Sequence, residues 1–331
     1  MVAAYSVWWL VTARMLESRI AAWIAEQQAA GATIAPPTVS IGGYPIALTA
    51  AIDGVALKWP TGFGFTSQHV RVSTHPWALH SFRVAVTGGF GFALPAGSSR
   101  PALTVAGETL RGGALFADTA LPLELKLTAD GVSATRTDTE SQPMREMIVA
   151  TLDFAATRPE TAPAQDTDVG LVLTLHLIDT SAAVLDGNPL GGTIADTAIE
   201  AKIMGPLPAS PDAAGLTAWR DKGGTIELDR LALGWGPLHL AAKGTVALDA
   251  QMQPEGAFTA HLTGYDKTID ALAGAGWLKP GPASLAKLAL GITARPGPDG
   301  QPAVDAPLTI QNRRLSLGPA KLGEIPALKL D

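Results

Sequence analysis

Three histidines within twelve residues form the densest group of potential metal ligands or catalytic bases in this chain. They are His69, His75 and His80 in the stretch HVRVSTHPWALH. A zinc site or a general base would need these imidazoles to converge with a further ligand or a carboxylate. Pro76 interrupts strand pairing after His75 and leaves His80 out of line with the other two. The stretch contains no carboxylate, so we expect the three histidines to have a structural role.

The other potential reacting groups lie where turns and connectors are expected. Asp166 and Asp168 lie in a polar segment, and Glu108 has no other carboxylate near it in the sequence. We therefore expect these residues to be solvated surface charges and not a pair of catalytic carboxylates. The stretch GGFGF (88–92) is glycine-rich, but it lies in strand-like sequence without the following helix that a phosphate loop needs. No Gly-x-Ser-x-Gly, Walker A or His-Glu-x-x-His motif occurs.

The chain has no cysteine, which excludes disulfides, thiolate catalysis and cysteine-ligated metal sites. We therefore expect no metal and no cofactor. An enzyme of the hydrolase type stays open only as a third hypothesis, because it would need converging polar groups in a pocket.

The composition is unusually apolar for a water-soluble body. Charged residues make up 16% of the 331 residues, against about 25% in an average soluble domain. The net charge of −6 argues against a nucleic-acid partner, which would need a basic face. One explanation is that much of the surface faces lipid or a partner. The other is that a GC-rich genome favours Ala, Gly and Pro codons in any fold. The composition leaves both explanations open.

Residues 4–30 are predicted to form one amphipathic helix that ends at Gly31. The first 13 residues carry no charge, which is too short a stretch to span a bilayer. Its tryptophans suit a bilayer interface and its arginines suit the adjacent headgroups, so these four are the candidate membrane-interface residues: Trp8, Trp9, Arg14 and Arg19. Alternatively, the apolar stripe packs on a sheet. We expect a membrane-proximal helix with its stripe docked on the rest of the protein: Trp9, Ala13, Leu16, Ile20, Trp23 and Ile24.

After Gly31 the apolar pattern changes to period two, which is typical of strands. Segments 46–59 and 121–136 each read as two strands around an Asp-Gly turn, and 303–319 reads as a hairpin around Asn312-Arg313. Segments 225–235 and 238–250 alternate in the same way, whereas 170–181 is a continuous apolar run that favours a strand covered on both faces.

Short helices are predicted near the C-terminus, at 211–222, 265–276 and 281–291. Many strands without regular β-α-β alternation favour a mainly β fold, that is, a β-rich α+β protein with large antiparallel, curved sheets. Linkers rich in Pro and Gly favour three parts: the end of a membrane anchor with its membrane-proximal helix, an N-terminal β region, and a C-terminal β region with short helices. Their bounds are 1–31, 32–204 and 205–331.

Several short motifs resemble an uncharacterised family of single-anchored envelope proteins, a domain of unknown function found mainly in alphaproteobacteria. The motifs are the opening Tyr-Ser-x-Trp-Trp, WIAEQQAAG (23–31), IGGYPIAL (41–48), HPWAL (75–79) and LALGWGPLHLAAKGTVALD (231–249). Tyr44 stands where that family usually has Phe, and most of its anchor is missing. The resemblance implies that residues 1–13 end a transmembrane helix, with the body on the periplasmic side of the inner membrane.

The C-terminal third also resembles the AsmA-like envelope proteins, in segments 256–278 and 315–328. That resemblance implies a curved sheet whose concave apolar face meets acyl chains. We therefore expect a non-catalytic, membrane-anchored protein that binds or passes phospholipid or other acyl lipid; the alternative is a structural or partner-binding scaffold of the envelope. The candidate lipid-facing residues are Leu231, Leu233, Leu238, Leu240, Val246 and Leu248.

Overall fold

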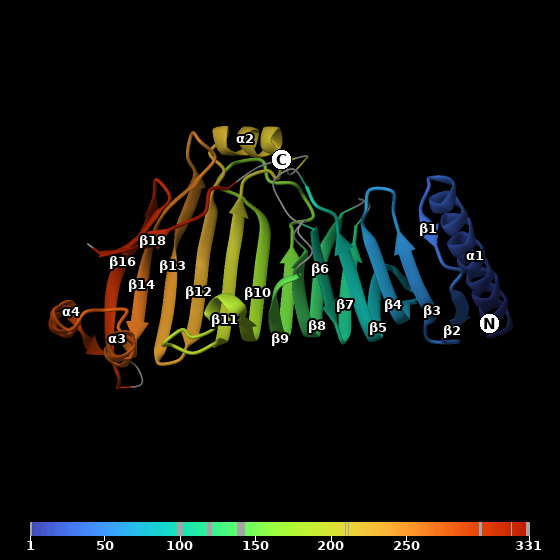
Figure 1. Ribbon diagram of the computed structural model, residues 1–331. Helices are drawn as coiled ribbons and strands as arrows, with labels where there is room; N and C mark the ends of the chain where they lie inside the picture. Colours follow the sequence, from blue (N-terminus) through green and yellow to red (C-terminus); the bar gives the residue numbers. More distant parts are fainter. Residues whose placement is uncertain are drawn as a thin grey trace. The chain divides into compact units, whose positions relative to one another are not determined.

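The chain divides into two compact units, Met1–Asp153 and Phe154–Asp331. Figure 1 shows the computed structural model, in which both units are built mainly of antiparallel strands. The boundary expected at residue 204 falls inside the second unit. The structure describes residues 2–97, 102–117, 121–137, 143–208, 210, 212–297, 300–318 and 320–328.

The first unit begins with helix α1 (Val2–Ala29), which agrees with the predicted helix and its stop. The amides of Gly31 and Ala32 bond back to the carbonyls of Gln28 and Gln27, and Gly31 has φ +91°. This paired geometry is a Schellman ending, which requires the left-handed conformation that glycine adopts without strain. The strands that follow are β1 (Thr33–Ile34), β2 (Thr38–Gly42), β3 (Leu48–Lys58), β4 (Gly64–His75), β5 (Ala78–Leu94), β6 (Ala102–Gly107), β7 (Thr109–Phe116) and β8 (Pro122–Thr137). The next strand, β9 (Pro143–Thr157), contains the boundary between the two units.

Strand pairing in this unit follows chain order. β3 pairs with β1 and β2 on one side and with β4 on the other, and β4 pairs with β5. β6 and β7 lie end to end between β5 and β8, and each pairs with both of them. Directly opposite side chains share a face in an antiparallel sheet. The row Ile52, Val70 and Val86 therefore marks the apolar face.

The two Asp-Gly pairs predicted to be hairpin turns are wrong as turns, because β3 and β8 run straight through them. Gly54 and Gly131 have φ +70° and +61°, so each makes a local irregularity inside one long strand. Ile52, Val55 and Leu57 line one cavity although their spacing breaks strict alternation. The positive-φ glycine thus shifts the alternation by one residue and keeps apolar side chains on one face.

Asp130, on the polar face beside Gly131, holds three neighbours together. Its carboxylate accepts hydrogen bonds from the Thr109 hydroxyl at 2.7 Å, Arg111 at 3.2 Å and Thr151 at 3.4 Å. These donors favour the ionised form, with Thr109 the largest cause, and lower the pKa of Asp130 below its ordinary value of 3.8.

A carboxyl group with a lowered pKa in the folded state stabilises the fold above the unfolded-state pKa and loses that contribution as the pH falls. We therefore expect the free energy of unfolding to fall more steeply below pH 3.8 in the wild type than in Asp130→Asn. Urea denaturation followed by circular dichroism at pH 7 and across pH 2–4 measures this difference. Equal acid dependence in the two proteins would contradict the assignment.

In its described residues, the second unit contains an antiparallel sheet and three short α-helices. In chain order its remaining elements are β10 (Val169–Ala182), η1 (Ala183–Leu185), β11 (Thr193–Met204), α2 (Ala213–Asp221), β12 (Ile226–Trp235), β13 (Leu238–Leu248), β14 (Pro254–Thr263), α3 (Tyr265–Gly274), α4 (Pro280–Thr293), β15 (Arg295–Pro296), β16 (Pro302–Gln311), β17 (Arg314–Leu317) and β18 (Ala320–Glu324). Neighbouring strands pair in this order, except that β14 pairs with β16 and β15 joins the end of β16.

The C-terminal hairpin forms where the sequence predicts it. β16 and β17 are joined at Asn312 and Arg313, whose φ angles are +50° and +63°. Two successive positive φ values match the twist of a two-residue hairpin turn. The three predicted helices also form, as α2, α3 and α4. The mainly β fold with an N-terminal helix and short C-terminal helices is therefore confirmed.

The sheet of the second unit has one apolar face and one polar face. On the polar face, polar and charged side chains pair across neighbouring strands: His176 with Asp196 at 2.5 Å, Lys202 with Asp229 at 2.9 Å and His261 with Asp305 at 2.8 Å. β10 was expected to be covered on both faces, but most of its side chains are only half-buried. That expectation is wrong because the described helices pack on other parts of the sheet rather than over β10.

Candidate functional site

Helix α1 is held against the first unit by its N-terminal aromatic residues. The Trp9 indole N–H donates to the Ala47 carbonyl at 3.1 Å, and its ring meets Tyr44 edge-on with centroids 5.5 Å apart. Tyr5 donates its hydroxyl proton to the Pro45 carbonyl. Trp9 and Ala13 form a buried cluster with Leu48 at the start of β3. The turn 43–47 thus clamps the first turns of α1 onto the sheet edge, which lies beside α1 in Figure 1.

We call these contacts between the start of α1 and the turn 43–47 the clamp. Beyond the clamp, α1 is not packed directly on the sheet. Two adjoining cavities of about 370 Å³ and 450 Å³ lie between α1 and the apolar face of β3, β4 and β5. They share Arg19, Ile20 and Ile52, and we call them together the α1 groove. Each is as large as a typical small-molecule pocket of roughly 300–1,000 Å³. Close-packed interiors leave few voids larger than a water molecule, so this space is unusual for a structural core.

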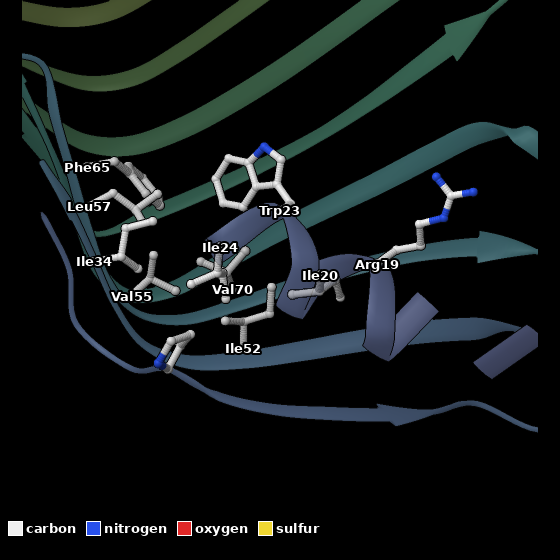
Figure 2. Close-up of a pocket in the computed structure, with 11 residues that line it drawn as sticks. Arg19, Ile20, Trp23, Ile24, Ile34, Ile52, Val55, Leu57, Phe65 and Val70 are labelled. Carbon is white, nitrogen blue, oxygen red and sulfur yellow. The ribbon is translucent and has the colours of Figure 1, made fainter. Parts of the chain in front are cut away.

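The first cavity is almost entirely apolar. Figure 2 shows Ile20, Trp23 and Ile24 of α1 opposite side chains of the sheet. The sheet side is formed by Ile34, Pro37, Ile52, Val55, Leu57, Phe65 and Val70. Apart from Arg19 and the Trp23 indole, the side chains that line this cavity are hydrocarbon, so the cavity suits a hydrocarbon chain.

The second cavity continues along α1 toward its N-terminus. From α1 it is lined by Thr12, Met15 and Leu16 in addition to the shared residues. The sheet side is formed by Leu48, Ala50, Ile52, Val72, Ser73, Thr74, Leu79 and Phe82. Two of these side chains, Met15 and Leu79, are about half exposed, so the groove is open to the surroundings along this edge.

The predicted stripe of α1 is confirmed as the side that meets the sheet. Trp9, Ala13 and Leu16 pack in the buried cluster, and Ile20, Trp23 and Ile24 line the groove. On the opposite side the first half of the helix is also apolar and exposed, so it is not amphipathic there. The exposed residues there are Val2, Val7, Trp8, Leu10 and Val11.

The four candidate membrane-interface residues are separated by the fold. Trp9 is only 6% exposed and contacts protein, whereas Trp8 is 42% exposed. Arg14 is exposed on α1 away from the groove, and Arg19 lines both of its cavities. Among the helices of the described residues, none combines the length and apolar composition needed to cross a membrane.

All six candidate lipid-facing residues of the second unit lie on one face of its sheet. The cross-strand pairs Leu231 with Ala242, Leu233 with Leu240, and Trp235 with Leu238 place them there. Leu231, Leu240 and Val246 pack against a buried cluster of Ala242, Phe258, Ala260 and Leu308. Leu233, Leu238 and Leu248 are half-buried on the same face. Their role as a lipid surface stays a prediction.

The three histidines do not converge. The His69 ring nitrogen Nδ1 lies 2.7 Å from an oxygen of Asp53 on the neighbouring strand, although the chain separates them by sixteen residues. His75 stacks on Trp77 and its Nδ1 lies 3.2 Å from the Ile46 carbonyl oxygen. Within the part of the chain that the structure describes, no three His, Asp or Glu side chains are grouped to hold a metal ion.

The other candidate reacting groups lie in turns and strands. The Asp168 carboxylate accepts from the amides of Ala164 and Gln165 at 3.2 Å and 3.1 Å, which organises a turn. Glu108 lies between β6 and β7, where its backbone bonds to Gly89 and Asp130. The glycine-rich stretch 88–92 lies inside β5 and leads to no helix. Asp166 has no hydrogen bond or ion pair with any other described residue.

The sheet side of the groove is not evident from the sequence. Ile52, Val70 and Val72 belong to strands whose alternation was evident, but the pairing that sets them opposite α1 depends on tertiary structure. The sequence contains one signal for it: the apolar helix stripe of six residues is followed, about two dozen residues later, by an alternating strand with Leu48, Ala50 and Ile52 on one side.

Neither a curated protein nor a solved structure matches the chain. A family model matches residues 9–326, a span that includes α1 from Trp9 onward and nearly all of both units. The match confirms the expectation of an uncharacterised bacterial family at that level. The chain belongs to the family described as an uncharacterized protein conserved in bacteria (DUF2125).

Proposed function

We propose that this protein binds acyl lipids without catalysis, and that the hydrocarbon chain lies in the α1 groove. The observation that carries the proposal is the space of about 370 Å³ and 450 Å³ enclosed almost wholly by apolar side chains. A site of this composition favours apolar surface because its burial is worth about 25 cal/mol per Å². It offers no set of converging polar groups of the kind a reaction would need.

The half-buried apolar face of the second unit supports the same reading. Within the part of the chain that the structure describes, the apolar side chains packed on the buried cluster of this face come from strands, and the leucines among them are half-buried, so they leave apolar surface that an acyl chain can cover. The AsmA-like resemblance of segments 256–278 and 315–328 supports this part of the proposal at the level of fold only.

Membrane anchoring and a periplasmic position are part of the proposal. The exposed apolar side of α1, with Trp8 next to Val7 and Val11, favours contact with a lipid surface, where amphipathic indole rings settle. A helix that meets lipid on one side and a groove on the other would place the groove beside the source of its ligand.

A structural or partner-binding role in the envelope is the second candidate function. It is favoured by an apolar stripe on the outer side of α4, where Leu285, Leu288 and Ile292 are 68%, 63% and 77% exposed. Trp277, between α3 and α4, is 63% exposed. Helix residues three and four apart lie on the same side, so these leucines and the isoleucine form one surface that fits an apolar face of a protein partner.

Purification of the full chain from a bacterial host, followed by extraction and mass spectrometry, tests the first function against the second. We expect about one acyl lipid per protein molecule, because an apolar groove that covers most of a bound chain retains it through purification. A matched sample of Ile20→Trp, in which a large side chain occupies the junction of the two cavities, is expected to carry much less lipid. A folded, lipid-free wild-type protein would contradict lipid binding and favour the scaffold role.

A further inference from the structure

Arg19 is the charged residue at the junction of the two cavities of the α1 groove. It is the one Lys, Arg, Asp or Glu side chain among the described residues that line them. The acidic residues of α1, Glu17 and Glu26, line neither cavity. Figure 2 shows the Arg19 side chain extending away from Ile20, Ile24 and the apolar side chains of the sheet.

The Arg19 side chain has no hydrogen bond or ion pair with any other described residue, in contrast to the side chains of Lys202 and Arg220. A guanidinium group presents five N–H donors in a planar fork that matches a carboxylate or a phosphate. Its hydrocarbon stem can follow an apolar surface while its charge stays in water. An unpaired arginine at an otherwise apolar site is therefore suited to an anionic group attached to a hydrocarbon.

The two cavities extend from Arg19 in opposite directions along α1. One runs toward Trp23 and Ile24, and the other runs toward Met15 and Thr12. A ligand with a single chain and its anionic group at Arg19 would fill only one of them. A lipid with two chains joined near one headgroup would fill both and bring its headgroup to Arg19.

We propose that the ligand of the α1 groove is a two-chain phospholipid whose phosphate pairs with Arg19 while one acyl chain occupies each cavity. This inference rests on the proposed lipid-binding function and adds the ligand class to it. The phosphate oxygens accept two parallel hydrogen bonds from the guanidinium group, and the lining side chains cover the chains.

The test measures binding of dipalmitoyl phosphatidate and of dipalmitoylglycerol to the full chain by native mass spectrometry. The two lipids have the same acyl chains and differ in the phosphate. Arg19→Gln is expected to weaken phosphatidate binding about tenfold or more and to leave dipalmitoylglycerol binding unchanged, because only the charged partner is lost. Arg14→Gln removes an exposed arginine of α1 outside the groove and is expected to change neither affinity.

Thermal unfolding of each variant shows that it is folded before binding is compared. If Arg19→Gln weakens the binding of both lipids equally, or weakens the binding of neither, the proposed role of Arg19 is overturned. Palmitate that binds as tightly as phosphatidate would overturn the two-chain assignment. Failure of the lipid-binding function itself looks different, because the wild type would then bind none of the three probes.

Discussion

Replacing Trp9 by alanine is expected to lower the free energy of unfolding by about 3–5 kcal/mol and to abolish acyl-lipid binding. Trp9 is 6% exposed, donates to the Ala47 carbonyl and packs on Tyr44 and Leu48. Its removal deletes the largest contact of the clamp that holds α1. Without that clamp the helix wall of the groove is no longer held opposite β3.

Trp8→Ala is the matched control, because Trp8 is the adjacent tryptophan and is 42% exposed. Its effect on the free energy of unfolding is expected to be within about 1 kcal/mol. Urea denaturation monitored by circular dichroism and lipid binding by native mass spectrometry check both proteins. Equal destabilisation in the two variants, or full lipid binding by Trp9→Ala, would show that the clamp does not hold the groove together.

Ile52→Asp is expected to reduce acyl-lipid binding by about a hundredfold while the protein stays folded. Ile52 lines both cavities and is half-buried, so the new carboxylate lies where the hydrocarbon chain would pass. Burying an unpaired charge under a bound chain costs several kcal/mol, whereas in the free protein the open groove lets water reach it.

Two substitutions frame this prediction. Ala51→Asp puts a carboxylate on the neighbouring residue, which lies opposite Arg71 on the polar face, and it should leave binding unchanged. Val86→Asp puts a charge at a site that is 1% exposed and should unfold the first unit. If Ile52→Asp unfolds like Val86→Asp, the space under α1 is core rather than groove; if it binds lipid like Ala51→Asp, the chain lies elsewhere.

The two predictions distinguish the contribution of α1 to lipid binding from the contribution of the sheet side of the groove. Trp9 acts through the position of α1, so its loss affects both stability and binding. Ile52 acts through the chemical character of the sheet side, so its loss affects mainly binding. A lipid that binds only to the second unit would be unaffected by either substitution and would direct attention to Leu240 and Val246.

Local structure was largely determined by the sequence alone. The long first helix and its end at Gly31, the three short helices and the hairpin at Asn312-Arg313 all form where periodicity and turn chemistry predict them. These features depend on residues close together in the chain, because capping, helix periodicity and tight turns are local interactions. The same is true of the mainly β fold class, since alternation marks each strand separately.

Only the tertiary structure decided whether the glycines of the Asp-Gly pairs form hairpin turns or irregularities inside long strands. An Asp-Gly pair suits a hairpin turn and a strand irregularity equally well, because both need a positive φ. Beside β3 the strand β4 continues past Gly54, and beside β8 the partner changes from β7 to β6 at Gly131, so in both cases the chain runs on and the apolar alternation shifts by one residue. The sequence alone does not show where the partner strands begin and end, so it does not distinguish a hairpin turn from an irregularity inside one long strand.

The candidate site was decided by contacts between distant segments. The bond of Trp9 to Ala47, the pairing of His69 with Asp53 and the shared position of Ile20 and Ile52 all join residues far apart in the chain. The sequence alone determined that an apolar helix stripe and alternating strands were present. That the helix docks at one end and leaves a groove beyond it follows only from how α1 and β3 to β5 pack.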